Sequence, residues 1–212
     1  MNYQIDNQTY EVVIIKKNNK NTYIRVKPDM KIYVTTNYFT SKHFIKKLLD
    51  ENIKDVKKML NIQNQKQEKN NNFYYLGKKY DIIYVNTVNN LTILDNKIIV
   101  KNDKELTKWY QKQMKEIFKE RLIYNYNLFK EDIPYPILKI RKMTTRWGVC
   151  NIKDNSITLN ANLMRSEIDK LDYVIIHELS HFIHFNHSNE FWQLVSKYCP
   201  NYKKMRKELK DW

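Results

Sequence analysis

The chain is poor in glycine, proline and cysteine, with two, four and two of them among 212 residues. Cys150 and Cys199 are too few for the disulfide framework of a small secreted protein, so we expect a reducing compartment. Apolar runs are only a few residues long, which excludes a transmembrane helix. The first 30 residues alternate polar and apolar, so no signal peptide is expected. These absences predict a cytoplasmic protein with no membrane partner.

Positive charge is what the chain has in excess. Lysine and arginine number 38 against 23 acidic residues, a formal net charge of +15. Such a field attracts nucleic acid or acidic partners. Lysine and asparagine are abundant along the whole length, however, which is typical of a biased source genome. Charge therefore leaves nucleic acid open as a partner, and it leaves the oligomeric state open as well.

The first half of the chain has the pattern of short strands and hairpins. Its segments are β-branched and aromatic, with turns containing Asn, Lys or Pro-Asp between them. One long helix is predicted from its N-cap Ser41, fading into a polar linker at residues 64–72. The predicted strands cover residues 9–17, 22–28 and 31–36, and two hairpins turn at Gly77 and at Asp95-Asn96.

The second half is predicted to be richer in helix. A long helix opens at Asp103 and runs to about Phe129. Residues 137–143 and 156–160 then form a β-pair. No internal repeat is visible. We therefore predict an α+β fold, with a β-rich region at 1–102 and a second domain at 103–212.

A further helix is expected from about Glu167, with Ser166 and Asp169 in a capping arrangement. Its apolar residues point in nearly every direction, which is typical of a buried helix. Asp172 is a candidate for orienting a histidine tautomer, and it is equally explained as first-turn helix charge.

Four of the five histidines lie in this segment, within IIHELSHFIHFNHSNEFW at residues 175–192. His177 and His181 are four residues apart, so on a helix both imidazoles can face one ion. Glu178 lies beside them, where it can take a proton from an attacking water. The H-E-x-x-H pattern therefore predicts a catalytic metal site, for which zinc needs a third protein ligand and an open fourth position.

Two histidines are candidates for the third ligand. His184 is ~10 Å along the axis from His177 if the helix is unbroken, which is too far for one ion. His187 can return to the ion if the helix ends first, and Asn186 tolerates the left-handed conformation that ends helices. Ser188 can then cap a new helix. We favour His187.

Chance and a purely structural zinc site account for the histidines less well. Random placement of five histidines and eleven glutamates produces the pattern with a probability of roughly 0.006. A closed structural zinc site leaves Glu178 without a role, and such sites favour cysteine. Cys150 is the weaker alternative as a ligand, because three histidines already suffice.

Several ordered motifs resemble the YgjP-like metallopeptidases, relatives of the WLM and SprT-like zinc peptidases. They are KPDMKIYVT and FYYLGKKYDI in the first half, then RWGVC, ITLN, LDYVIIHELSH, NHSNEFW and CPNYKKMRKEL. Their order and spacing extend over nearly the whole chain. The family usually reads RWGSC, and Val149 stands here in place of that serine. The hairpin between RWGVC and ITLN usually carries a glycine, and here Asn155 must make the turn.

The resemblance implies one Zn²⁺ per chain, held by His177, His181 and His187, with Glu178 as the catalytic base. It also implies a zincin-like C-terminal half, in which the H-E-x-x-H helix packs on a small β-sheet. Arg146 is a candidate substrate-binding residue, beside an edge strand that could take an extended peptide. An internal ion pair explains Arg146 equally well.

Together these features predict a zinc-dependent peptidase that acts on polypeptides. The alternative is a basic, nucleic-acid-associated protein whose zinc site is structural or vestigial. The basic C-terminal segment, residues 202–212, is predicted to be a solvated amphipathic helix.

Overall fold

A computed structural model describes residues 1–210 of the chain, with the side chains of residues 69 and 70 excepted. The chain divides into two compact units, Met1–Asn71 and Asn72–Trp212. Both mix helices and strands, which confirms the α+β class. The boundary predicted between residues 102 and 103 falls inside the second unit and stays a prediction about independently folding domains. No helix among the described residues is long and apolar enough to cross a membrane.

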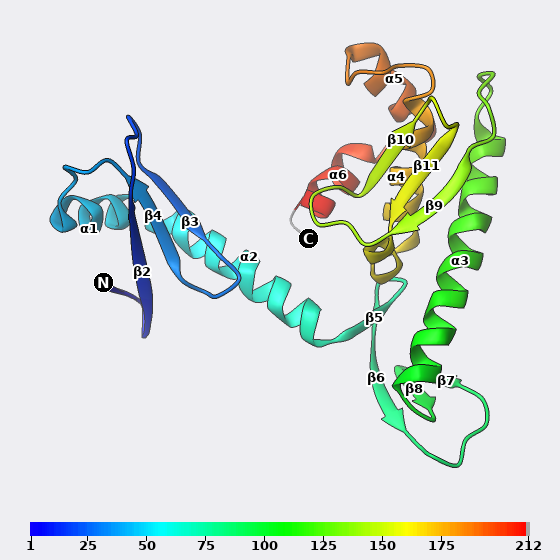
Figure 1. Cartoon of the computed structure of the whole chain (residues 1–212), viewed down its shortest axis with the longest axis horizontal. Helices are drawn as coiled ribbons and strands as arrows, with labels where there is room; N and C mark the ends of the chain where they lie inside the picture. The colour runs from blue at the N-terminus through cyan, green and yellow to red at the C-terminus, as the bar shows by residue number, and fades with distance from the viewer. Residues whose placement is uncertain (211–212) are drawn as a thin grey trace. The chain divides into compact units, whose positions relative to one another are not determined.

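The first unit is a four-stranded sheet with two helices (Figure 1). The sheet order is β1-β2-β4-β3, with a parallel β2–β4 pair and antiparallel outer pairs. The fully buried Ile32, Val34, Ile45 and Leu49 lie at the centre of its core. The elements are β1 (Asn2–Ile5), β2 (Gln8–Lys16), β3 (Tyr23–Val26), β4 (Ile32–Thr36), α1 (Lys42–Glu51) and α2 (Ile53–Asn71).

The prediction of a polar linker at residues 64–72 is wrong. The long helix predicted from Ser41 is instead two helices, and the second, α2, continues to Asn71. Glutamine, lysine and glutamate are good helix formers, so polarity alone does not end a helix. The side-chain amide of Gln63 also donates to the Val26 carbonyl at 3.3 Å, which attaches this helix to the sheet.

The second unit begins with a sheet whose strand order, β5-β6-β8-β7, repeats that of the first unit. Its β6–β8 pair is parallel and its outer pairs are antiparallel, as in β1–β4. A residue with positive φ lies in each hairpin turn of both units: Asp6 and Met30 in the first, and Gly77 and Asp95 in the second. The prediction of no internal repeat is therefore wrong for the topology. Part of the sequence repeats as well, because Asp29, Lys31, Ile32 and Val34 around β4 recur as Asp95, Lys97, Ile98 and Val100 around β8.

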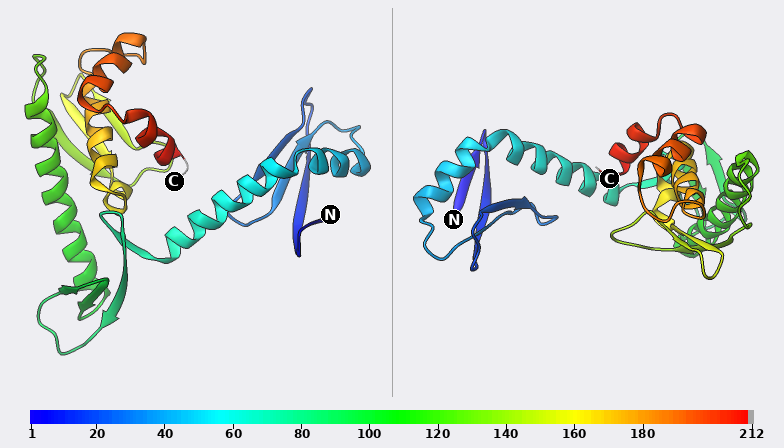
Figure 2. Two further views of the ribbon diagram at one scale, coloured as in Figure 1. Left: turned by 180° about the vertical axis from the view of Figure 1, so that it is seen from behind. Right: turned by 90° about the horizontal axis from the view of Figure 1, so that it is seen from above.

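A second, three-stranded sheet has the order β10-β11-β9 and supports the helix α4. The predicted pair of strands, β9 and β11, is parallel, and β10 forms a hairpin with β11 that turns at Asn155 with φ +45°. Seen from behind in Figure 2, α4 lies between α3 and the C-terminal α6. The elements are β5 (Phe73–Tyr75), β6 (Lys78–Tyr84), β7 (Thr92–Leu94), β8 (Lys97–Val100), α3 (Asp103–Leu128), β9 (Ile137–Arg141), β10 (Gly148–Asn151), β11 (Ser156–Asn160), the 3-10 helix η1 (Ala161–Arg165), α4 (Ile168–Ser180), α5 (Asn189–Tyr198) and α6 (Tyr202–Lys210).

Helix α4 is buried on most sides, as its sequence predicts. Leu171, Ile175 and Leu179 are at most 1% exposed, and they pack in the core of the second unit. Ser166 is not its N-cap, because the Ser166 hydroxyl instead donates to the Leu163 carbonyl at the end of η1. The helix is therefore held by burial more than by capping.

An ion pair links α3 to α4 in this core. Arg121 donates to both carboxylate oxygens of Asp172 at 2.8 and 2.6 Å, and the Asn125 amide donates to the same carboxylate at 2.8 Å. The two charged side chains are 20% and 18% exposed. Asp172 thus joins two helices and does not orient a histidine.

We expect Arg121→Ala to lower the free energy of unfolding by about 2 kcal/mol, because it leaves a mostly buried carboxylate with one amide partner. Urea titration followed by circular dichroism measures the loss. Lys112→Ala is the control in the same helix, since Lys112 faces Glu116 in an exposed pair at 3.9 Å. It should cost less than about 0.5 kcal/mol. Equal losses of unfolding free energy in the two variants would show that the Arg121–Asp172 pair stabilises the fold no more than an exposed pair does.

Candidate metal centre and active site

Three of the predicted site residues come together where α4 ends and α5 begins. His177 lies in the last turn of α4, His181 is its C-cap, and His187 lies just before α5. Their ligand nitrogens all lie within 4.8 Å of one another. Among the described residues, this is the group whose donor atoms could surround one metal ion.

The spacing of these nitrogens suits a small metal ion. The Nε2 atoms of His177 and His187 are 3.0 Å apart. Two nitrogens that bind one tetrahedral zinc at about 2.0–2.1 Å lie roughly 3.3 Å from each other. The observed separation therefore fits two imidazoles directed at a common centre.

A tight turn brings His187 back, and Asn186 does not make it as predicted. At the end of α4 the backbone hydrogen bonds span three residues instead of four, because the N–H groups of residues 181–183 donate to carbonyls three residues earlier. Asn186 is not among the residues with positive φ. Ser188 caps α5 as predicted, accepting a bond from the Phe191 N–H at 3.5 Å. The helix thus ends at Ser180 in a turn of 3-10 type hydrogen bonds, and no residue in the left-handed conformation is needed to end it.

Hydrogen bonding orients one of the three rings. The Nδ1 of His181 lies 3.1 Å from the His184 carbonyl, which leaves Nε2 free to bind a metal. His184 contributes this carbonyl and is outside the nitrogen cluster. The Nδ1 of His177 is buried with no hydrogen-bond partner among residues 1–210, so nothing in that part of the chain fixes its tautomer.

The surroundings favour the neutral form of all three histidines. Burial lowers the pKa of His177 to about 3, and the charges of His181, His187 and Arg206 act in the same direction. Burial likewise lowers the pKa values of His181 and His187 below 6.5. Neutral imidazole is the form that binds a metal ion, so the site is ready for one at neutral pH.

Aromatic rings pack against the histidines, of which His177 and His181 are half-buried and His187 is exposed. Phe191 is fully buried, and its ring centroid is 4.6–4.9 Å from those of the three imidazoles. Trp192 stacks on His187 at 5.5 Å and on Tyr202 at 5.2 Å. The Arg206 guanidinium lies 4.6 Å from the Trp192 centroid. Sequence reasoning missed Arg206, because only the packing of α6 brings it to this site.

Glu178 is buried beside the histidines and points toward β10. Its carboxylate oxygens are outside the group of donor atoms that could surround one ion, so Glu178 lies next to that group and is not a fourth member of it. Burial raises its pKa to about 8, while a hydrogen bond from the Cys150 N–H and the charge of Arg146 lower it. A carboxylate with a raised pKa in a dry environment is suited to accept and return a proton near neutral pH.

The segment before β10 divides its roles between structure and site. The Trp147 indole donates to the Leu209 carbonyl at 3.0 Å and packs on the core. Arg146 is exposed, and its charge acts on Glu178. Cys150 is half-buried, and burial raises the pKa of its thiol to about 12, which disfavours the thiolate that a metal would bind.

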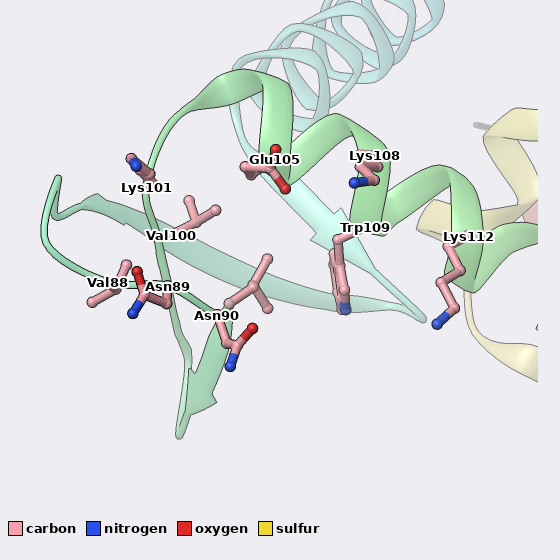
Figure 3. A pocket seen from close by; sticks show the side chains of 10 residues that line it. Val88, Asn89, Asn90, Val100, Lys101, Glu105, Lys108, Trp109 and Lys112 are labelled. Atoms are coloured by element: carbon pink, nitrogen blue, oxygen red, sulfur yellow. The ribbon is translucent and has the colours of Figure 1, made fainter.

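A pocket elsewhere in the second unit contains none of the predicted site residues. It lies between the segment that joins β6 to β7, the end of β8 and α3, and Figure 3 shows Trp109 at its wall. Both signs of charge line it: Lys101, Lys108 and Lys112 are positive, and Glu105 is negative. It is separate from the histidine site.

One family of known proteins matches most of the chain. The family model described as "YgjP-like, metallopeptidase domain" matches residues 20–212. Among solved structures, the chain is similar to the Pyrococcus abyssi abylysin metallopeptidase zymogen, with 24% identity, TM-score 0.40, and 43% of this chain and 90% of that one covered. The Methanocaldococcus jannaschii jannalysin zymogen is similar at 27% identity and TM-score 0.33, over 45% and 96%. A comparison with curated proteins finds no match.

The matched domain and its histidine cluster define the class: the protein is a metallopeptidase, and its family implies a catalytic metal. More particularly, the chain belongs to the YgjP-like family, because the family model matches nearly the whole length of the chain. This confirms the resemblance seen in the sequence motifs.

Proposed function

We propose that the chain is a zinc-dependent peptidase in which His177, His181 and His187 hold the ion and Glu178 is the general base. The observation that carries the proposal is the convergence of three imidazole nitrogens within 4.8 Å of one another, next to the buried carboxylate of Glu178. A zincin-like arrangement, with the H-E-x-x-H helix packed on β10 and β11, is part of the proposal.

The residues of the chain divide the work of hydrolysis. When bound, zinc supplies Lewis acidity that polarises the scissile carbonyl and acidifies the attacking water. Glu178 takes the proton from that water and returns it to the leaving amine. Phe191 and Trp192 pack against the imidazoles and hold them in place.

Arg146 is proposed to bind the substrate. Its exposed guanidinium lies next to the edge strand β10 and acts electrostatically on Glu178. A guanidinium in that position can hold a carboxylate or a backbone carbonyl of an extended peptide. Arg206, whose guanidinium lies against the Trp192 ring, is a second cation near the histidines.

Metal removal tests this function. We expect the purified protein to contain about one equivalent of zinc and to cleave unfolded polypeptides. A chelator should lower cleavage at least about 100-fold, and stoichiometric Zn²⁺ should restore it. Metal analysis measures the zinc content, and a panel of peptides measures cleavage. A zinc-loaded protein that cleaves nothing in a broad panel would contradict the peptidase, and cleavage that survives complete zinc removal would contradict the zinc dependence.

The nucleic-acid alternative rests on the net charge of +15. It predicts an affinity that falls steeply with salt and is lost without residues 1–100. A structural zinc site could use the histidines but leaves the buried Glu178 beside them without a role, so we prefer the peptidase.

A further inference from the structure

Gly148, at the start of β10, lies against the side chain of Glu178. A Cβ atom at Gly148 would be 2.7 Å from Cγ and 2.8 Å from Cδ of Glu178, and it would collide with Oε1 as well. The φ of Gly148 is outside the left-handed region, so its backbone would accept alanine. The glycine is therefore required for space and not for backbone conformation.

The strand also offers Glu178 a hydrogen bond. The Asn160 N–H donates to the Trp147 carbonyl, and the register pairs Cys150 with Ile157. Because bonded and non-bonded pairs alternate along an antiparallel ladder, the N–H of Cys150 faces away from β11. Since β10 is the edge strand, that N–H is available, and it donates to the Glu178 carboxylate.

We propose that β10 is a rigid seat for the Glu178 carboxylate, in which Gly148 is a positioning residue that admits the side chain and the Cys150 N–H orients it. The proposal rests on the proposed function, in which Glu178 is the base. It adds that the position of the base is set by a strand distant in sequence. The histidine helix holds the ligands, and β10 places the proton acceptor relative to them.

The packing makes this seat stiff. Glu178 is only 5% exposed, so its carboxylate has little room to take another position. The strand below it is paired with β11, whose Ile157 and Leu159 are fully buried. A methyl group at Gly148 must therefore displace the carboxylate and not the strand. A displacement of about 1 Å at a catalytic group costs on the order of 100-fold in rate.

Gly148→Ala tests the proposal in the full-length, zinc-loaded protein. We expect one equivalent of zinc, an unchanged KM and a kcat lowered about 100-fold. Thermal unfolding of Gly148→Ala, Glu178→Ala and the double variant provides a second readout. The melting temperature lost in Gly148→Ala should be regained when Glu178 is truncated, because the methyl group then meets no side chain. If Gly148→Ala fails to fold, a folded double variant supports the proposal and an unfolded one overturns it.

Ile157→Val is the control for a weakened sheet, since it removes a methyl group from the core of β11 and leaves Gly148 unchanged. Its kcat should stay within about threefold of wild type. A wild-type kcat in Gly148→Ala would overturn the proposal, as would a stability loss that truncation of Glu178 does not relieve. The stability cycle needs no activity, so a protein that cleaves nothing would contradict the peptidase while the seat is still tested.

Discussion

Glu178→Gln is expected to abolish peptide cleavage while about one equivalent of zinc stays bound. The amide keeps the size of the side chain and can still occupy the seat formed by β10. It cannot take up a proton from water, and loss of a positioned general base costs about 10²–10⁴ in rate. Metal analysis and kcat/KM on an unfolded polypeptide measure the two effects separately.

The matched control is Glu116→Gln, an exposed glutamate in α3 whose ion pair with Lys112 is 3.9 Å long. It should leave both zinc content and kcat/KM unchanged. If Glu178→Gln keeps more than about one tenth of the activity, Glu178 is not the base. If it loses the zinc, the residue acts on the metal site and the assigned role is wrong.

His187→Ala is expected to lose the metal, and His184→Ala to keep it. His187 contributes an imidazole nitrogen 3.0 Å from that of His177, so its removal leaves two ligands. Loss of a partner that only orients a ligand already costs about 10–100-fold in zinc affinity, and loss of a ligand should exceed that. Activity should fall with it.

His184→Ala is the control because the two histidines are three residues apart and differ in what they supply. His184 offers its backbone carbonyl to His181, and alanine keeps that carbonyl. Zinc titration against a competing chelator measures both affinities. An equal loss in the two variants would mean that the turn, and not the His187 ring, determines metal binding.

Local patterns made much of the site predictable. His177 and His181 are one helical turn apart, and that spacing depends on the geometry of a single helix. The strands at residues 9–17, 22–28 and 31–36 were predictable because alternation and β-branching are also local. The placement of His187 followed from excluding His184 by distance along the helix axis.

Errors arose where a distant segment decided the outcome. The polar residues 64–72 looked like a linker, yet the Gln67 side-chain amide donates to the carbonyl of Pro28, 39 residues away. For Asp172 the sequence left a histidine partner and first-turn helix charge both open, and its carboxylate forms an ion pair with Arg121 of α3. In each case the local sequence allowed two structures, and a tertiary contact selected one.

The sequence by itself determined the chemistry available to this protein: two histidines one helical turn apart, an adjacent carboxylate, and a buried helix to hold them. Only the tertiary structure decided how that chemistry is arranged. The turn after Ser180 brings His187 to the pair, α6 brings Arg206 toward them, and β10 brings Gly148 against Glu178. Spacing within a helix is set by bonds along the chain, whereas the approach of a strand to a helix is set by packing between segments that are far apart in sequence.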